Sequence, residues 1–133
     1  MFHLLVKYDG WADGRDFLAL ERAFEFTDAE LIPRSPDGAL DFDRVLGAPA
    51  LFTTEIRGKG AKYARVGTIG RVRSQGSRIQ IDYTFDGTIA PLAFSTLERL
   101  TRELSIDSVE LSRTHWAIKN IDLFKVLLAT QSA

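Results

Sequence analysis

The clearest pattern in the chain is an alternation of apolar and polar residues between positions 78 and 85. Successive side chains of a strand point to opposite faces, so one face of this strand carries only apolar residues. These are Ile79, Ile81, Tyr83 and Phe85. A second extended run, 64–73, precedes it, and the connection Ser74-Gln75-Gly76-Ser77 predicts a β-hairpin of the longer type.

The first strand of this hairpin carries bases on one side. Arg65, Arg71 and Arg73 have the same parity, which predicts that they share the solvent side. Two glycines, Gly67 and Gly70, interrupt the run and predict a bend or bulge, as in a sheet that curls toward a barrel.

Other segments predict further strands and helices. We expect strands at 2–8 and 51–56, an extended piece within 16–26 followed by a helical turn near Thr27, a turn of helix at 42–46, and an extended run at 109–119. Apolar residues at helical spacing predict an amphipathic helix over 91–104, starting at Pro91. A last helix is expected over 121–129, with Asn120 as its cap.

These elements predict an α+β fold in a single domain, 1–133. The sheet would be curled and antiparallel, with about five or six strands, two main helices packed on it, and a small β-barrel as the closed alternative. No internal repeat, low-complexity tract or linker divides the chain.

Composition excludes several kinds of site. The chain has 133 residues, is 45% hydrophobic, and contains no cysteine and only two histidines. A disulfide scaffold, a thiolate metal site and a cysteine nucleophile are therefore excluded, and we expect neither a metal nor a cofactor. No apolar run has the length of a membrane span, so we expect a cytoplasmic protein without membrane contact.

Charge is unevenly distributed although the net charge is only −1. Residues 1–55 carry eleven acids against five bases, whereas residues 56–80 carry seven bases and no acid. This basic strip is a candidate anion-binding or nucleic-acid-binding surface. Its alternatives are a solvated hairpin face and pairing with the acidic N-terminal half. The bases are Arg57, Lys59, Lys62, Arg65, Arg71, Arg73 and Arg78.

A second candidate site lies in the segment from 113 to 120. Arg113, His115 and Lys119 could hold a phosphate or carboxylate beside Trp116. The internal alternative pairs Arg113 with an N-terminal carboxylate, bonds His115 to the backbone and places Trp116 in the core. Trp11, in a loop with two glycines, could stack on a ligand or cover one edge of the core.

Searches for catalytic motifs fail. The sequence has no G-x-S-x-G elbow, no Walker loop and no H-E-x-x-H motif. Acid–base catalysis by His115 stays open, but nothing in the sequence places a nucleophile beside it. We therefore expect a protein that is not an enzyme.

Several segments together resemble a known type of domain. They are Asp9-Gly10-Trp11 with Gly14-Arg15, residues 24–28, the run PALFTTE from Pro49, residues 64–69, and RTHWAIKNIDLFKVLL from Arg113. In these pieces the chain resembles the uncharacterised N-terminal domain found ahead of TIR-like or nucleoside-deoxyribosyltransferase-like domains in bacterial, defence-related proteins. The sequence ends at Ala133, where the nucleotide-handling domain would begin. The resemblance thus implies a sensing, binding or assembly module and supplies no catalytic residues.

Together these features predict a non-enzymatic binding or sensing module. Its expected partner is a small anionic ligand or another protein. One alternative is a homo-oligomerisation or effector-regulating interaction domain. The other is a nucleic-acid-binding domain that uses the 56–80 hairpin, an interpretation weakened by the 18 acids of the chain.

Overall fold

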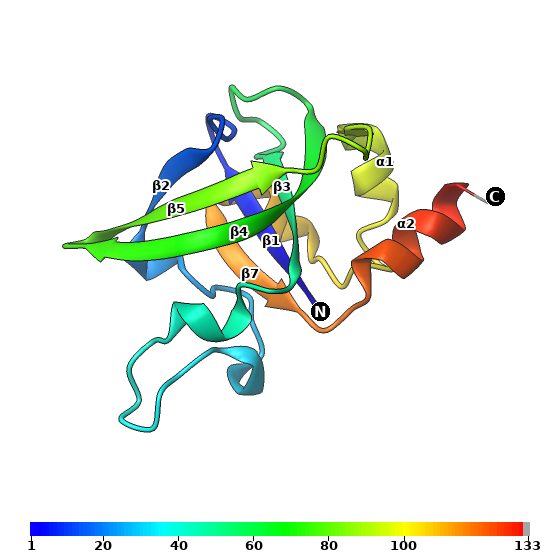
Figure 1. Ribbon diagram of the computed structural model, residues 1–133. Coiled ribbons are helices and arrows are strands. Elements are labelled where there is room, and N and C mark those ends of the chain that lie inside the picture. Colours follow the sequence, from blue (N-terminus) through cyan, green and yellow to red (C-terminus); the bar gives the residue numbers. More distant parts are fainter. Residues whose placement is uncertain (132–133) are drawn as a thin grey trace.

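The computed structural model describes residues 1–131 and is built mainly from β-strands (Figure 1). The strands pair in the order β2-β5-β4-β3-β1-β7, with β6 paired to β4. Their bounds are β1 Phe2–Lys7, β2 Arg15–Ala19, β3 Pro49–Thr54, β4 Tyr63–Gln75, β5 Arg78–Phe85, β6 Leu92–Ala93 and β7 His115–Lys119. The helices are α1, Phe94–Arg99, and α2, Leu123–Gln131, and short 3₁₀ helices include Phe42–Val45 and Ser108–Ser112.

The fold agrees only in part with the predicted class. The sheet has seven strands and is mixed, because β1 runs parallel to β3 while its other neighbour, β7, is antiparallel. It is an open sheet, so the barrel alternative is wrong. An isolated bridge between Ala23 and Trp116 is the point where the chain beyond β2 meets β7. With one helix of six residues and one of nine, the protein is mostly β rather than evenly α+β.

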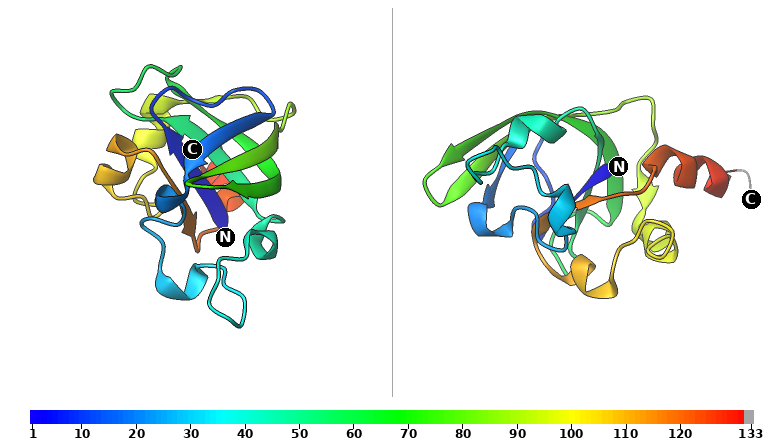
Figure 2. Two further views of the ribbon diagram at one scale, coloured as in Figure 1. Left: turned by 90° about the vertical axis from the view of Figure 1, so that its left-hand side faces the viewer. Right: turned by 90° about the horizontal axis from the view of Figure 1, so that it is seen from below.

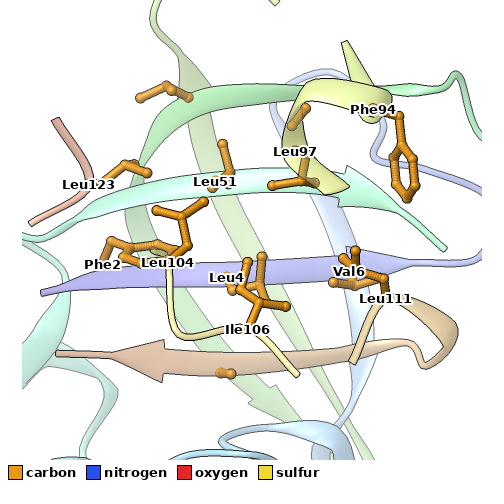
Figure 3. Close-up of a cluster of buried hydrophobic side chains, with 13 residues drawn as sticks. Phe2, Leu4, Val6, Leu51, Phe94, Leu97, Leu104, Ile106, Leu111 and Leu123 are labelled. Atoms are coloured by element: carbon orange, nitrogen blue, oxygen red, sulfur yellow. The ribbon is translucent and has the colours of Figure 1, made fainter. Parts of the chain in front are cut away.

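Both faces of the sheet carry a buried apolar layer. The inner face includes Leu5, Ile79, Ile81 and Trp116, which pack inside the curl of the sheet. The outer face includes Leu4 and Val66 among others, and its layer lies between β1, β3 and β4 on one side and α1, the 104–111 segment and α2 on the other. Figure 3 shows side chains of β1 and β3 meeting those of α1 and of this segment.

The helices cover only one end of the outer face. In Figures 1 and 2 the tip of the β4–β5 hairpin and helix α2 lie at opposite ends of the molecule. The outer face of β2, β5 and the second half of β4 therefore remains open to solvent, and Arg15, Arg71 and Arg73 on it are exposed.

The hairpin is confirmed, with two differences of detail. Its loop is the pair Gly76-Ser77, and Gly76 has a φ of 66°, which suits glycine. The pairing shifts between Ile69 and Arg71, which confirms the predicted bulge. The bulge also reverses the parity of β4, so Arg65 lies on the inner face and Arg71 on the outer one. The prediction that they share a face is wrong.

Two predicted helices are shorter or displaced. Where the helix 91–104 was expected, Leu92 and Ala93 pair with β4, and α1 ends at Arg99. Within α2 the backbone N–H of Lys125 donates to Asp122 Oδ1, so Asp122 caps the helix in place of Asn120.

One further local prediction is wrong in part, and another is confirmed. The run 109–119 is extended only over β7, because residues 108–112 form a 3₁₀ helix. There Glu110 reaches back to accept a hydrogen bond from the N–H of Asp107 at 2.7 Å, as in a capping box. The helical turn expected near Thr27 is the 3₁₀ helix Ala29–Leu31, and the hydroxyl oxygen of Thr27 accepts a hydrogen bond from Ile118 N.

No helix within residues 1–131 has both the length and the apolar composition needed to cross a membrane.

Candidate functional site

The 113–119 candidates are engaged inside the protein. His115 and Trp116 are fully buried, and Lys119 is nearly so. Arg113 is more exposed, and its guanidinium makes a bidentate ion pair with Glu25. The hydrogen bonds from its nitrogens to the two carboxylate oxygens measure 3.0–3.2 Å. Burial alone would raise the pKa of Glu25, but the hydrogen bonds from Arg113 and the nearby positive charges lower it below its usual range. This geometry matches the internal alternative for Arg113.

Behind this pair lies a buried cluster of three ionisable side chains, Glu110, His115 and Lys119. Lys119 Nζ lies 2.8 Å from Glu110 Oε1 and also donates to the carbonyl of Phe26 at 3.2 Å. His115 Nε2 lies 3.4 Å from the same Glu110 oxygen, and His115 Nδ1 lies 2.7 Å from the carbonyl of Arg113. Burial would raise the pKa of Glu110, but hydrogen bonds from its partners hold it below its usual value. The cluster fastens the segment around Phe26 to β7.

The other histidine belongs to the inner core. His3 Nε2 donates to the carbonyl of Val45 at 2.6 Å, and His3 Nδ1 accepts a hydrogen bond from Trp116 Nε1 at 3.0 Å. Burial lowers the pKa of His3 from 6.5 to about 4. Trp116 is therefore held in the core by a neutral imidazole.

The basic strip is divided among three places. Arg57, Lys59 and Lys62 lie on the loop between β3 and β4. Arg65 lies on the inner face of β4, whereas Arg71, Arg73 and Arg78 point outward from the hairpin. Within residues 1–131 no ion pair joins any of these bases to an acid of the N-terminal half. The predicted pairing of the strip with those acids is therefore not found.

Strand β2 adds residues to the outward-pointing group that the sequence interpretation missed. The register places Arg15 opposite Asp82, which in turn pairs with Arg71. The next rows along the sheet are Phe17–Gln80–Arg73 and Ala19–Arg78–Gln75. We call this surface the arginine face; it consists of Arg15, Phe17, Arg71, Arg73, Arg78, Gln80 and Asp82. The alternation of Arg15, Phe17 and Ala19 with buried Leu18 was the signal in the sequence.

The arginine face has one carboxylate for four guanidinium groups. Arg15 Nε donates to Asp82 Oδ1 at 2.7 Å, and this hydrogen bond, with the charges of Arg15 and Arg71, lowers the pKa of Asp82. The guanidinium of Arg78 lies 4.1 Å from the centre of the Phe17 ring. In the described part of the chain, the side chains of Arg71 and Arg73 make no hydrogen bond. Both residues are exposed, so their donors are available to an acceptor.

Trp11 and Arg65, which were predicted for different sites, line the same cavity. This Trp11 cavity has a volume of about 140 Å³ and lies at the end of the inner layer. Its lining residues are Asp9, Gly10, Trp11, Phe52, Thr53, Thr54, Ala61, Tyr63, Arg65 and Phe85. Trp11 Nε1 donates to the carbonyls of Leu5 and Thr53, at 3.2 and 3.1 Å, so the indole is fixed as a wall of the cavity.

Comparison with known proteins gives no family for this chain. No family model matches it, and no match was found among curated proteins or solved structures. The resemblance to the domains that precede TIR-like domains therefore stays a prediction, and the function has to be inferred from the surfaces described above.

Proposed function

We propose that this chain is a non-enzymatic binding module that recognises an anionic ligand through its arginine face. The observation that carries the proposal is the register of β2, β5 and β4. It gathers Arg15, Arg71, Arg73 and Arg78 on an uncovered sheet surface with Asp82 as the only acid.

The chemistry of this surface suits phosphate or carboxylate groups. A guanidinium offers a planar set of donors that matches both, and it stays charged at any physiological pH. Residues two apart on one strand are separated by roughly 6.6 Å, and neighbouring strands by roughly 4.8 Å. Arg71 and Arg73 therefore form a row along β4, and Arg15 lies two strands away. An extended ligand with repeated negative charges could contact several of these groups together.

The other candidate surface is less suited to a ligand. Around β7 the charges of Glu25, Glu110, Arg113 and Lys119 are satisfied by one another. A ligand there would have to replace an internal partner, and removing one member of a buried pair is costly. On the arginine face only Arg15 has an ion-pair partner, which is Asp82.

A salt titration tests the proposal. Binding of a short fluorescein-labelled oligothymidylate, followed by anisotropy, should weaken strongly from about 50 to about 200 mM salt. The double variant Arg71→Gln/Arg73→Gln should reduce the salt slope by about 1.4, since each phosphate contact of a single strand contributes about 0.7. The control Arg99→Gln/Arg102→Gln removes the same charge from exposed positions at the helical end and should keep the slope.

Two results would refute the proposal. One is no binding at low salt; the other is equal weakening by both double variants, which would show that only net charge matters. Absence of binding together with a mass that rises with concentration in light scattering would favour the interaction-domain alternative. The proposal that the module serves a bacterial defence-related protein rests on the sequence resemblance alone.

A further inference from the structure

The Trp11 cavity is a separate feature from the arginine face. Its walls come from the β1–β2 loop, the end of β3, the loop before β4 and the inner face of the β4–β5 pair. Arg65 reaches it from the inner face of β4, whereas Arg71 and Arg73 leave the same strand on the outer face. A ligand in the cavity would therefore not touch the arginine face.

The walls of the cavity are locked by backbone contacts. The carbonyl oxygen of Tyr8 accepts hydrogen bonds from the N–H groups of Lys59 and Gly60, at 2.8 and 3.2 Å, and from Thr54 Oγ1 at 3.2 Å. A Cβ at Gly60 would lie 2.7 Å from the N and Cα atoms of Gly10, so only glycine allows the two loops to meet this closely. The cavity is thus formed before any ligand binds.

Lys62 fixes the loop between β3 and β4. Lys62 Nζ donates to the carbonyls of Glu55, Ile56 and Gly58 at 2.8–3.1 Å. These three bonds use all the donors of the ammonium group, so Lys62 serves the loop and is not available to a ligand.

Arg65 is held in place but keeps its donors. Its guanidinium lies 4.7 Å from the centre of the Phe85 ring and 5.6 Å from that of Tyr63. Such stacking uses the face of the guanidinium and leaves the N–H groups at its edge. Neither Arg65 nor Asp9, the other charged residue of the lining, makes a hydrogen bond or an ion pair through its side chain with the residues the structure describes. The cavity therefore presents one cation and one carboxylate without hydrogen-bonded partners.

We propose that the Trp11 cavity binds a small zwitterion of amino-acid size. Its carboxylate would be held by the edge of the Arg65 guanidinium, its ammonium group by the carboxylate of Asp9, and its apolar part by Trp11 and Phe85. The volume supports this class, because clefts for drug-sized ligands measure roughly 300–1,000 Å³ and this cavity measures about 140 Å³. A ligand with a single charge would leave Arg65 or Asp9 unpaired.

Indole resonances give a direct test with the whole chain. The probes are L-alanine, acetate and methylammonium, added to ¹⁵N-labelled protein. L-alanine should shift the Trp11 indole N–H signal in a saturable way. Acetate and methylammonium should bind at least about tenfold more weakly, because each lacks one charge-assisted contact. The Trp116 indole, bonded to His3 in the core, is the internal reference and should not move.

Single substitutions then locate the two charges. Arg65→Gln and Asp9→Asn should each weaken L-alanine binding by about tenfold or more. The matched controls, Arg73→Gln and Asp43→Asn, remove the same charges elsewhere and should bind as the unaltered protein does. An unchanged Trp116 indole signal in the Arg65 variant shows that the fold is retained.

Three results would overturn the proposal. They are no shift of the Trp11 signal with L-alanine, acetate binding as tightly as L-alanine, and unchanged binding in the Arg65 variant. Because Arg73→Gln alters only the arginine face, weaker oligothymidylate binding with a salt slope lower by about 0.7, together with retained L-alanine binding, separates the two sites.

Discussion

The protonation of His3 gives a prediction that can be worked out in numbers. The ring is fully buried, with Nε2 donating to the Val45 carbonyl and Nδ1 accepting from Trp116 Nε1. A proton on Nδ1 would set two N–H groups against each other and place a charge in an apolar core. This is why burial lowers the pKa of His3 from 6.5 to about 4.

The sign of the effect on stability follows from proton binding. Below pH 6.5 the unfolded chain takes up a proton at His3, while the folded chain resists it until about pH 4. The stability contributed by neutral His3 is therefore fully present above pH 6.5 and is lost as the pH falls toward 4. With about 1.36 kcal/mol per pKa unit, the loss is about 2 kcal/mol between pH 7 and 5, and about 3 kcal/mol by pH 4.

Urea unfolding at pH 7, 6 and 5 measures this loss, and NMR titration of the imidazole Cε1–H signal measures the pKa directly. Carboxyl groups with lowered pKa values, such as those of Glu110 and Asp82, lose their contribution to stability only as the pH falls below their usual pKa of about 4. They therefore do not contribute to the loss between pH 7 and 5. The variant His3→Gln keeps a donor and an acceptor without titrating, and its stability should depend less on pH. The reasoning is refuted if His3 titrates near pH 6.5. It is also refuted if His3→Gln loses as much stability between pH 7 and 5 as the unaltered protein does.

Two further substitutions test the buried cluster and the close contact within the sheet. Glu110→Gln should lower the free energy of unfolding by about 3–5 kcal/mol, because it leaves the ammonium of Lys119 buried without a countercharge; urea unfolding checks this, and a loss below about 1 kcal/mol would contradict it. Gly67→Ala should destabilise by about 1–3 kcal/mol, since a Cβ there would lie 2.5 Å from the carbonyl oxygen of Thr84. Gly87→Ala, with open space around it, is the control and should leave the midpoint of unfolding nearly unchanged.

Local patterns in the sequence predicted the hairpin but not the distribution of its charges. Burial of Ile79, Ile81 and Tyr83 confirms the alternation in β5. In β4 a straight alternation fails, because the strand contains the bulge that its glycines predict. One extra residue at Gly70 moves Arg65 and Arg71 to opposite faces.

Features that depend on distant parts of the chain could not be read from local patterns. The parallel pairing of β1 with β3 joins residues far apart in the sequence, and periodicity carries no information about strand direction. Leu92 and Ala93 form a strand because β4 offers them an edge, although their spacing fits a helix. The capping arrangement of Asp107 and Glu110 is different, since its spacing is visible in the sequence and would have predicted the helical turn there.

The same distinction explains which charged residues are candidates for binding. Glu25 and Arg113 are separated by 88 positions, so no count of charge along the chain could show that they neutralise each other. The fold brings acids to Arg113, Lys119 and Arg15. The ion pairs of Arg113 and Lys119 stabilise the fold. Among residues 1–131 the fold brings no ion-pair partner to Arg71, Arg73 or Arg65. Since a cation without an ion-pair partner gains most from an added anion, function is best sought at these positions. The bulge places Arg65 on one face of β4 and Arg71 and Arg73 on the other. The Trp11 cavity and the arginine face can therefore be altered independently.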